Sequence, residues 1–104
     1  MKLIYVCSPY SGDIPNNTIY AQKASRMVVD MGHIPIAPHL LFPQFMSEES
    51  ERELALKMDL KLIDKCYEVW VFGERMSKGM QMEVDYAVHK GMFVRFVNLE
   101  REGK

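Results

Sequence analysis

The stretch Glu68–Ala87, EVWVFGERMSKGMQMEVDYA, joins an apolar strand pattern to an amphipathic helix pattern through a short loop. Glu68–Phe72 ends in a continuous apolar run, which predicts a strand. Ser77 is a typical helix N-cap, and the pattern behind it predicts a helix over Lys78–Lys90 that Gly91 ends. A strand followed by a loop and a helix is typical of the units that build parallel α/β sheets.

The rest of the chain repeats this alternation. Patterns of the same kind predict strands at Lys2–Cys7, His33–Pro38 and Met92–Val97, a helix at Thr18–Met31, and a long helix from Ser50, which is spaced as a capping box with Glu53. The prolines of the second strand favour an edge position. The apolar segment after it reads as a loop or short turn. The order β-α-β-α-β-α-β predicts a parallel sheet with helices on both faces.

The length and composition indicate an ordinary globular protein. A chain of 104 residues with 48% hydrophobic residues predicts a single domain over residues 1–104. A net charge of −1 gives no general attraction to nucleic acid or to an anionic membrane. No apolar run reaches the roughly 20 residues that span a bilayer. The amino-terminal segment reads as a buried strand and not as a signal peptide, so we expect a cytoplasmic protein.

Three segments are expected to meet at one edge of the sheet, because ligands of such sheets bind beyond the carboxyl ends of the strands. These segments are Ser8–Gly12, Pro38–Pro43 and Phe72–Gly79. The residues that we expect to contact a ligand are Ser8, Pro9, Tyr10, Ser11, Gly12, His39, Phe42, Phe72, Gly73, Ser77, Gly79 and Met80. The His and Cys residues show no metal-ligand spacing, so we expect no metal, and no cofactor is indicated.

Each of these segments also has a plainer interpretation. The backbone amides of the first loop suit phosphate or sugar oxygens, but the loop is neither a P-loop nor a dinucleotide-binding motif and equally fits a plain turn. His39 suits a hydrogen bond either to a ligand or to loop carbonyls. Phe42 suits stacking on a base or packing in the core.

Glu83 is the most unusual residue of the last helix, because it shares an apolar face with Met80 and Ala87. The helix start, with Ser77 and Gly79, suits an anion that approaches the backbone closely. A partly desolvated carboxylate one turn further along suits nucleophilic attack or the anchoring of a ligand hydroxyl. The alternative is a carboxylate that reaches solvent past the methionines.

The chain resembles the nucleoside 2-deoxyribosyltransferase-like superfamily, in particular a small branch found in bacterial and phage genomes. The resemblance covers nearly the whole chain and rests on the motifs IYVCSPYSG, GHIPIAPHLLFP and DLKLIDKCYEVWVFGERMSKGMQMEVDYA. It implies a flavodoxin-like three-layer sandwich with a parallel sheet of four to five strands. It also implies attack by Glu83 on the sugar C1′ of a nucleoside or nucleotide, phosphate contacts at Ser77 and Gly79, and a sugar-and-base loop at Ser8 to Gly12.

The resemblance has one departure and leaves alternatives open. The family pattern implies an Asp at the start of the third strand that helps to protonate the departing base or to position the nucleophile, and Tyr67 stands there. A phenol is a poor substitute for such an acid. We therefore expect either N-glycosidic chemistry at Glu83 and Tyr67, or a non-catalytic protein that sequesters or senses an ADP-ribose-like or cyclic nucleotide signal, such as a phage anti-defence sponge. A structural module with a vestigial pocket is a third alternative. The resemblance also implies a homo-oligomer.

Overall fold

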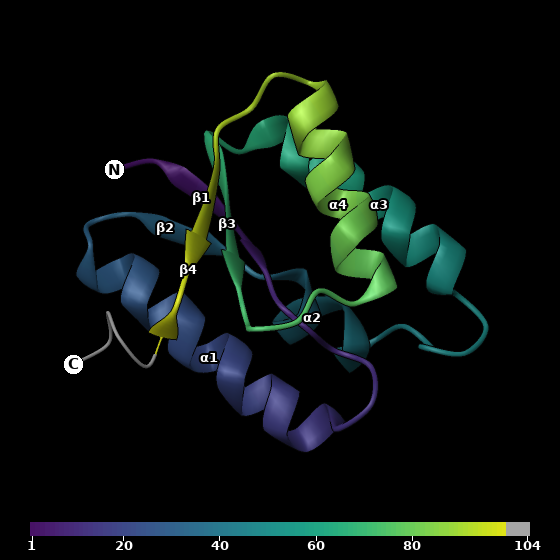
Figure 1. The fold of residues 1–104 in the computed structure, drawn as a ribbon. Helices are drawn as coiled ribbons and strands as arrows, with labels where there is room; N and C mark the ends of the chain where they lie inside the picture. Colours follow the sequence, from purple (N-terminus) through teal and green to yellow (C-terminus); the bar gives the residue numbers. More distant parts are fainter. Residues whose placement is uncertain (100–104) are drawn as a thin grey trace.

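The computed structural model describes residues 1–99. Strands and helices alternate along the chain (Figure 1), in the order β1 (Leu3–Cys7), α1 (Ile14–Asp30), β2 (Ile34–Ile36), α2 (Pro38–Leu41), η1 (Phe42–Gln44), α3 (Arg52–Lys65), β3 (Glu68–Phe72), α4 (Lys78–His89) and β4 (Val94–Val97). The four strands form one parallel sheet in the order β2-β1-β3-β4. The predicted parallel sheet is therefore confirmed, and β2 lies at an edge as expected.

The order in which strands are added to the sheet reverses between β1 and β3. From β1 the chain runs outward to β2 and then returns across β1 to β3 and β4. The registers Tyr5↔Val69 and Cys7↔Val71 fix the two central strands side by side. Loops that leave such neighbouring strands in opposite directions open a crevice at their carboxyl ends, which is where ligands of this architecture bind.

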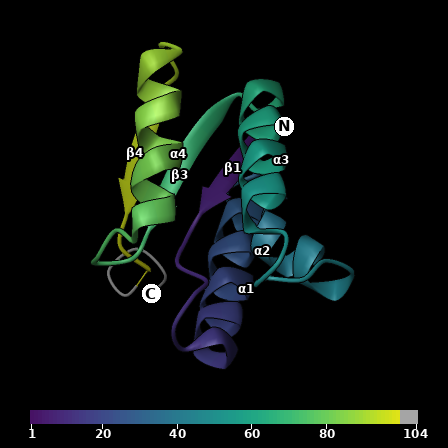
Figure 2. The same ribbon diagram turned by 90° about the vertical axis from the view of Figure 1, so that its right-hand side faces the viewer.

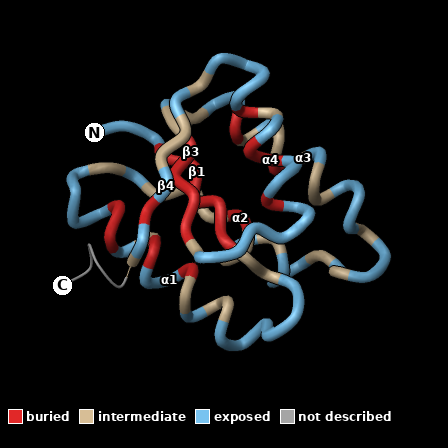
Figure 3. Tube along the Cα trace, viewed as in Figure 1, coloured by how far each residue is buried: buried red, intermediate tan, exposed pale blue. Residues whose placement is uncertain are grey.

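Helices cover both faces of the sheet, as the alternation predicts (Figure 2). Ile4, Val6, Trp70 and Phe72 pack against α1 on one face. On the other face, the alternate residues Tyr5, Cys7, Val69 and Val71 pack against α3 and α4. Figure 3 shows the buried chain concentrated in the central strands and in the inner sides of these helices. The result is an α/β sandwich of three layers, consistent with a flavodoxin-like fold.

Several predicted boundaries are wrong for local reasons. Helix α1 begins at Ile14 and not at Thr18, because the Asp13 side chain caps it by accepting a hydrogen bond from the Asn16 amide. The second strand stops at Ile36, because Pro38 opens α2. The segment expected as a loop or turn forms the short helices α2 and η1.

The predicted capping box of the long helix does not form, and the last strand is shorter than expected. Helix α3 begins at Arg52, and its N-cap Glu51 makes no side-chain cap hydrogen bond. The Glu51 carboxylate instead accepts from the Ser47 amide at 2.9 Å, within the turn that precedes the helix. Strand β4 begins at Val94, two residues later than expected. Strand β3 has the predicted bounds.

Candidate functional site

The three predicted segments do meet at the carboxyl edge of the sheet. The Tyr10 ring, after β1, stacks on the His39 ring of α2 with centroids 5.1 Å apart. Gly73, after β3, has a φ of +119°, and a Cβ there would lie 3.5 Å from Pro9 Cδ. A glycine suits this position because the backbone conformation is one that other residues rarely adopt. The loop after β1 therefore contacts both other segments.

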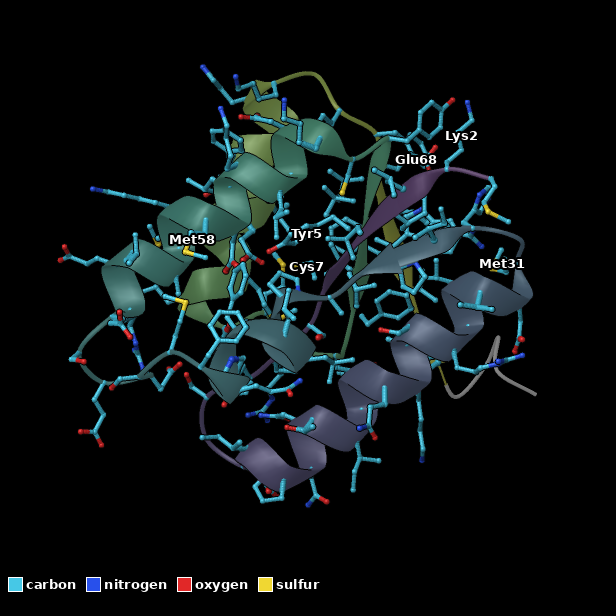
Figure 4. The ribbon with its side chains drawn as sticks, turned by 180° about the vertical axis from the view of Figure 1, so that it is seen from behind. Lys2, Tyr5, Cys7, Met31, Met58 and Glu68 are labelled. Atoms are coloured by element: carbon cyan, nitrogen blue, oxygen red, sulfur yellow. The ribbon has the colours of Figure 1, made fainter. Side chains whose placement is uncertain are left out.

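Glu83 lies beneath this edge, on the inner face of α4. It is 3% exposed, among the apolar side chains of the α4 face. The Tyr5 hydroxyl donates to Glu83 Oε2 at 2.8 Å, and Cys7 Sγ lies 3.4 Å from Glu83 Oε1. Tyr5 and Cys7 lie close together on β1, on the side of the sheet that α3 covers (Figure 4). The plainer interpretation of Glu83, a carboxylate that reaches solvent, is excluded by this burial.

Asp59 is the second buried carboxyl group of the site, and it was not among the residues predicted from the sequence. It lies on the inner face of α3, is 6% exposed, and lies close to Glu83. Burial, and then the interaction with Glu83 and its charge, raise the pKa of Asp59 to about 9. Its Oδ1 has no hydrogen-bond partner among residues 1–99. The two helices thus bring Glu83 together with a second carboxyl group, Asp59, which keeps its proton at neutral pH.

The groups that surround the carboxyl pair are uncharged at neutral pH. Burial, followed by the neighbouring Glu83, raises the pKa of both the Tyr5 hydroxyl and the Cys7 thiol well above their ordinary values, so both remain hydrogen-bond donors. Burial lowers the pKa of His39, against the opposing effect of the Glu83 charge. Ser8 is 1% exposed, and its Oγ has no partner in the described part of the chain. Two unpartnered polar atoms, Ser8 Oγ and Asp59 Oδ1, therefore lie in this region of the fold.

The structure does not bring Tyr67 to Glu83. Tyr67 is 57% exposed, its amide donates to the Leu3 carbonyl, and its ring lies 4.2 Å from Lys2 Nζ. These contacts place it at the amino ends of β1 and β3, whereas the three predicted segments meet at their carboxyl ends. We had expected the partner of Glu83 to lie just before β3, at the position of Tyr67. The carboxyl group close to Glu83 comes from α3 instead.

The other predicted site residues divide into exposed and buried sets. Ser77 caps α4 as predicted, accepting from the Met80 amide at 3.2 Å, and an added Cβ on Gly79 would meet only open space. Met80 is 2% exposed within the α4 core. Phe72 is fully buried on the opposite, α1 face, so its side chain does not line a site at Glu83.

The remaining three predicted residues lie at the periphery of the site. Phe42 is partly buried and packs edge-on against Phe45, with ring centroids 6.2 Å apart, so it contacts another ring of its own segment. Ser11 donates to the Glu48 carboxylate at 3.2 Å. Gly12 has a φ of +97° in the turn that leads into α1.

A hollow of about 420 Å³ is lined by Pro9 and Gly73 together with α1 residues such as Asn16 and Tyr20. Neither Glu83 nor Asp59 lines this hollow. The candidate site is therefore defined by the buried cluster around these two residues. Within residues 1–99 no three His, Cys, Asp or Glu side chains are arranged to hold a metal ion. None of the helices described is long and apolar enough to span a membrane.

Comparisons with known proteins agree with this architecture. The chain is similar in structure to a 2-deoxyribosyltransferase from the psychrotolerant bacterium Bacillus psychrosaccharolyticus, with a TM-score of 0.76, 21% identity, and coverage of 93% of this chain and 72% of that one. It is also similar to a 2-deoxyribosyltransferase from Leishmania mexicana, with a TM-score of 0.69, 15% identity, and coverage of 100% and 73%. A search of curated proteins finds no match.

The two structural similarities show that the chain has a nucleoside 2-deoxyribosyltransferase-like fold, as the sequence motifs implied. The sequence itself matches one family model over residues 2–97, which is nearly its whole length. The chain therefore belongs to the family described as a domain of unknown function, DUF7768.

Proposed function

We propose that this protein binds a nucleoside or nucleotide at the carboxyl ends of β1 and β3 and cleaves or transfers at its N-glycosidic bond. The observation that supports this most is the buried pair of Glu83 and Asp59, with Tyr5 donating to Glu83. Two carboxyl groups in different protonation states are the usual equipment for breaking a bond at an anomeric carbon. The fold of the two deoxyribosyltransferases supports the same class of ligand.

In the first step of the proposed reaction, Glu83 is the nucleophile and Asp59 is the general acid. A Glu83 oxygen forms a bond to the sugar C1′ while the C1′–N bond to the base breaks. The proton of Asp59, whose pKa of about 9 keeps it bound at neutral pH, moves to the departing base nitrogen. The products are a glycosyl ester on Glu83, a neutral base and an Asp59 carboxylate.

In the second step, water or another base attacks C1′ and releases Glu83. The proton of the attacking group returns to the Asp59 carboxylate, so both side chains regain their initial states. Attack by water gives hydrolysis, and attack by a base gives transfer. A phosphate on the ligand would be held by the α4 start at Ser77 and Gly79, where the first amides of the helix point outward.

The Tyr10–His39 stack is the proposed wall of the base site. The two rings lie 24° from parallel, and His39 is held next to the Ser8 backbone. Aromatic faces of this kind bind bases by stacking. A homo-oligomer and a cytoplasmic location remain predictions that accompany this function.

The alternative of a non-catalytic signal-sequestering protein was based on Tyr67. Because Tyr67 lies away from Glu83 and Asp59 supplies a carboxyl group in its place, that reason for favouring the alternative no longer applies. No other contact among the described residues favours it over the enzymatic function.

The test is the release of free base, measured by chromatography after incubation with deoxynucleosides and with their 5′-monophosphates. We expect release by the native protein and a loss of at least about 100-fold in Glu83→Gln and Asp59→Asn. Mass spectrometry of the quenched reaction should show the glycosyl adduct on Glu83. Asp85→Asn is the matched control, because Asp85 is exposed on the same helix and accepts a hydrogen bond from Gln81 at the surface.

Two results would refute the proposal. One is the absence of base release with every compound of both classes. The other is release that continues undiminished in Glu83→Gln. A ligand recovered intact from the heat-denatured protein, together with a thermal shift and no release, would support the sequestering alternative instead.

A further inference from the structure

Besides Tyr5, Cys7 of β1 also contacts the Glu83 carboxylate. It is fully buried, and its Sγ lies 3.4 Å from Oε1, while the Tyr5 hydroxyl lies 2.8 Å from Oε2. Residues two apart on a strand point to the same face of the sheet. The strand therefore presents two hydrogen-bond donors, one to each oxygen of a single carboxylate.

The thiol has one proton and two acceptors within reach. The Met80 carbonyl lies 3.9 Å from Sγ, which is longer than the 3.4 Å to Glu83 Oε1. A carboxylate oxygen is also the stronger acceptor, because it is charged. Burial and the nearby Glu83 raise the pKa of the Cys7 thiol, so the proton stays on sulfur. Both distance and charge therefore direct the S–H toward Glu83.

We propose that Cys7 is a positioning residue that, together with Tyr5, fixes the orientation of the Glu83 carboxylate from below. With one donor on each oxygen, rotation of the carboxylate about its last bond breaks both contacts. The lone pairs not engaged by β1 then point in a constant direction, toward the edge where the ligand binds. A thiol is a weak donor, so it restrains Oε1 while withdrawing little electron density from it.

The catalytic consequence of this role rests on the proposed function, but the hydrogen bond itself does not. The first experiment therefore measures the bond directly, by Raman spectroscopy of the S–H stretching band. The chain contains two cysteines, so the Cys66→Ser protein has Cys7 as its only thiol. We expect a band at the frequency of a hydrogen-bonded thiol that moves to higher frequency in Glu83→Gln and further in Glu83→Leu.

Tyr86→Phe is the control for this measurement. Tyr86 lies on α4, as Glu83 does, but its hydroxyl donates to Asp64 at the surface, at 2.7 Å. Removal of that hydroxyl should leave the S–H band unmoved. A band that does not respond to either Glu83 substitution would overturn the proposal, since the S–H would then donate to the Met80 carbonyl and not to Glu83.

The second experiment compares the kinetics of base release in two variants of Cys7. Cys7→Ala should lower kcat about 10- to 100-fold, with KM changed less than about twofold, because a misaligned nucleophile affects the reaction more than ligand binding. Cys7→Ser restores a donor and should recover most of kcat. A native kcat in Cys7→Ala, or no recovery in Cys7→Ser, would overturn the positioning role.

Failure of this proposal is distinguishable from failure of the proposed function. If the native protein releases no base, the function fails while the Raman band still decides whether Cys7 holds Glu83. If base is released and the band ignores Glu83, the function stands and the positioning role fails.

Discussion

Asp59→Asn should abolish a fall in stability that the native protein shows as pH rises. The folded protein holds the Asp59 proton up to about pH 9, whereas the unfolded chain releases it near the ordinary value of 3.8. Between these values the folded state binds more protons than the unfolded state, so raising the pH favours unfolding. The expected slope is about 1.4 kcal/mol per pH unit for one proton.

The window from about pH 6.5 to about pH 8 isolates this effect. The pKa of His39 is lowered from 6.5, so its contribution, which raises stability with pH, is half complete at pH 6.5 and nearly complete at about pH 7.5, and within the window it offsets less than about 0.5 kcal/mol of the loss. The pKa values of Cys7 and Tyr5 are raised from 9.0 and 10.0, so their contributions begin above it. Over this range the native protein should lose about 2 kcal/mol of unfolding free energy.

The assay is urea unfolding at several pH values, with the slope m checking that the unfolding transition itself is unchanged. Asp59→Asn should give a flat profile across the window, and Asp64→Asn, on the same helix, should keep the native slope. Asp64 serves as the control because it lies at the surface, where it accepts from Tyr86, away from the buried pair. A native profile that is flat or rises with pH, or a slope that survives in Asp59→Asn, would refute the reasoning.

Three further substitutions test other contacts of the site by the same unfolding assay. Tyr5→Phe leaves a buried carboxylate oxygen without its donor and should cost about 1–3 kcal/mol, while Tyr86→Phe at the surface should cost less. Ser77→Ala removes the cap of α4 and should cost about 1 kcal/mol, which Ser77→Asp should largely avoid. Gly73→Ala should cost about 1 kcal/mol or more because of its positive φ, and an unchanged or raised stability would contradict that assignment.

The sequence was sufficient for features that depend on local patterns. Strand β3 and helix α4 match their predicted positions closely, because an apolar run, a capping Ser77 and a stop at Gly91 all lie within one stretch. Glu83 also stood out locally, as a carboxylate on an apolar helix face. These signals require no knowledge of what packs against them.

The contacts between elements could not be predicted in the same way. Asp59 lies four residues before the buried Ile63 on α3, so it occupies an inner position of that helix just as Glu83 does on α4. That pattern was a usable signal for a buried acid. That the two face each other depends on how α3 packs on α4. The strand pattern likewise places Tyr5 and Cys7 on one face of β1. It does not predict that Glu83 packs against that face.

The polar cluster of Glu83, Asp59 and Ser8 at the carboxyl edge of the sheet is expected to oppose folding. Two carboxyl groups are withdrawn from water between the sheet and two helices, and Asp59 Oδ1 and Ser8 Oγ have no partner within the described residues. Burying such groups without full hydrogen bonding costs free energy that apolar side chains of similar size would not. Tyr5 and Cys7 donate to Glu83 and reduce this cost there, and the interaction of Asp59 with Glu83 reduces it at Asp59. An arrangement that opposes folding while fixing the orientation of one carboxylate is best explained by a function at that carboxylate.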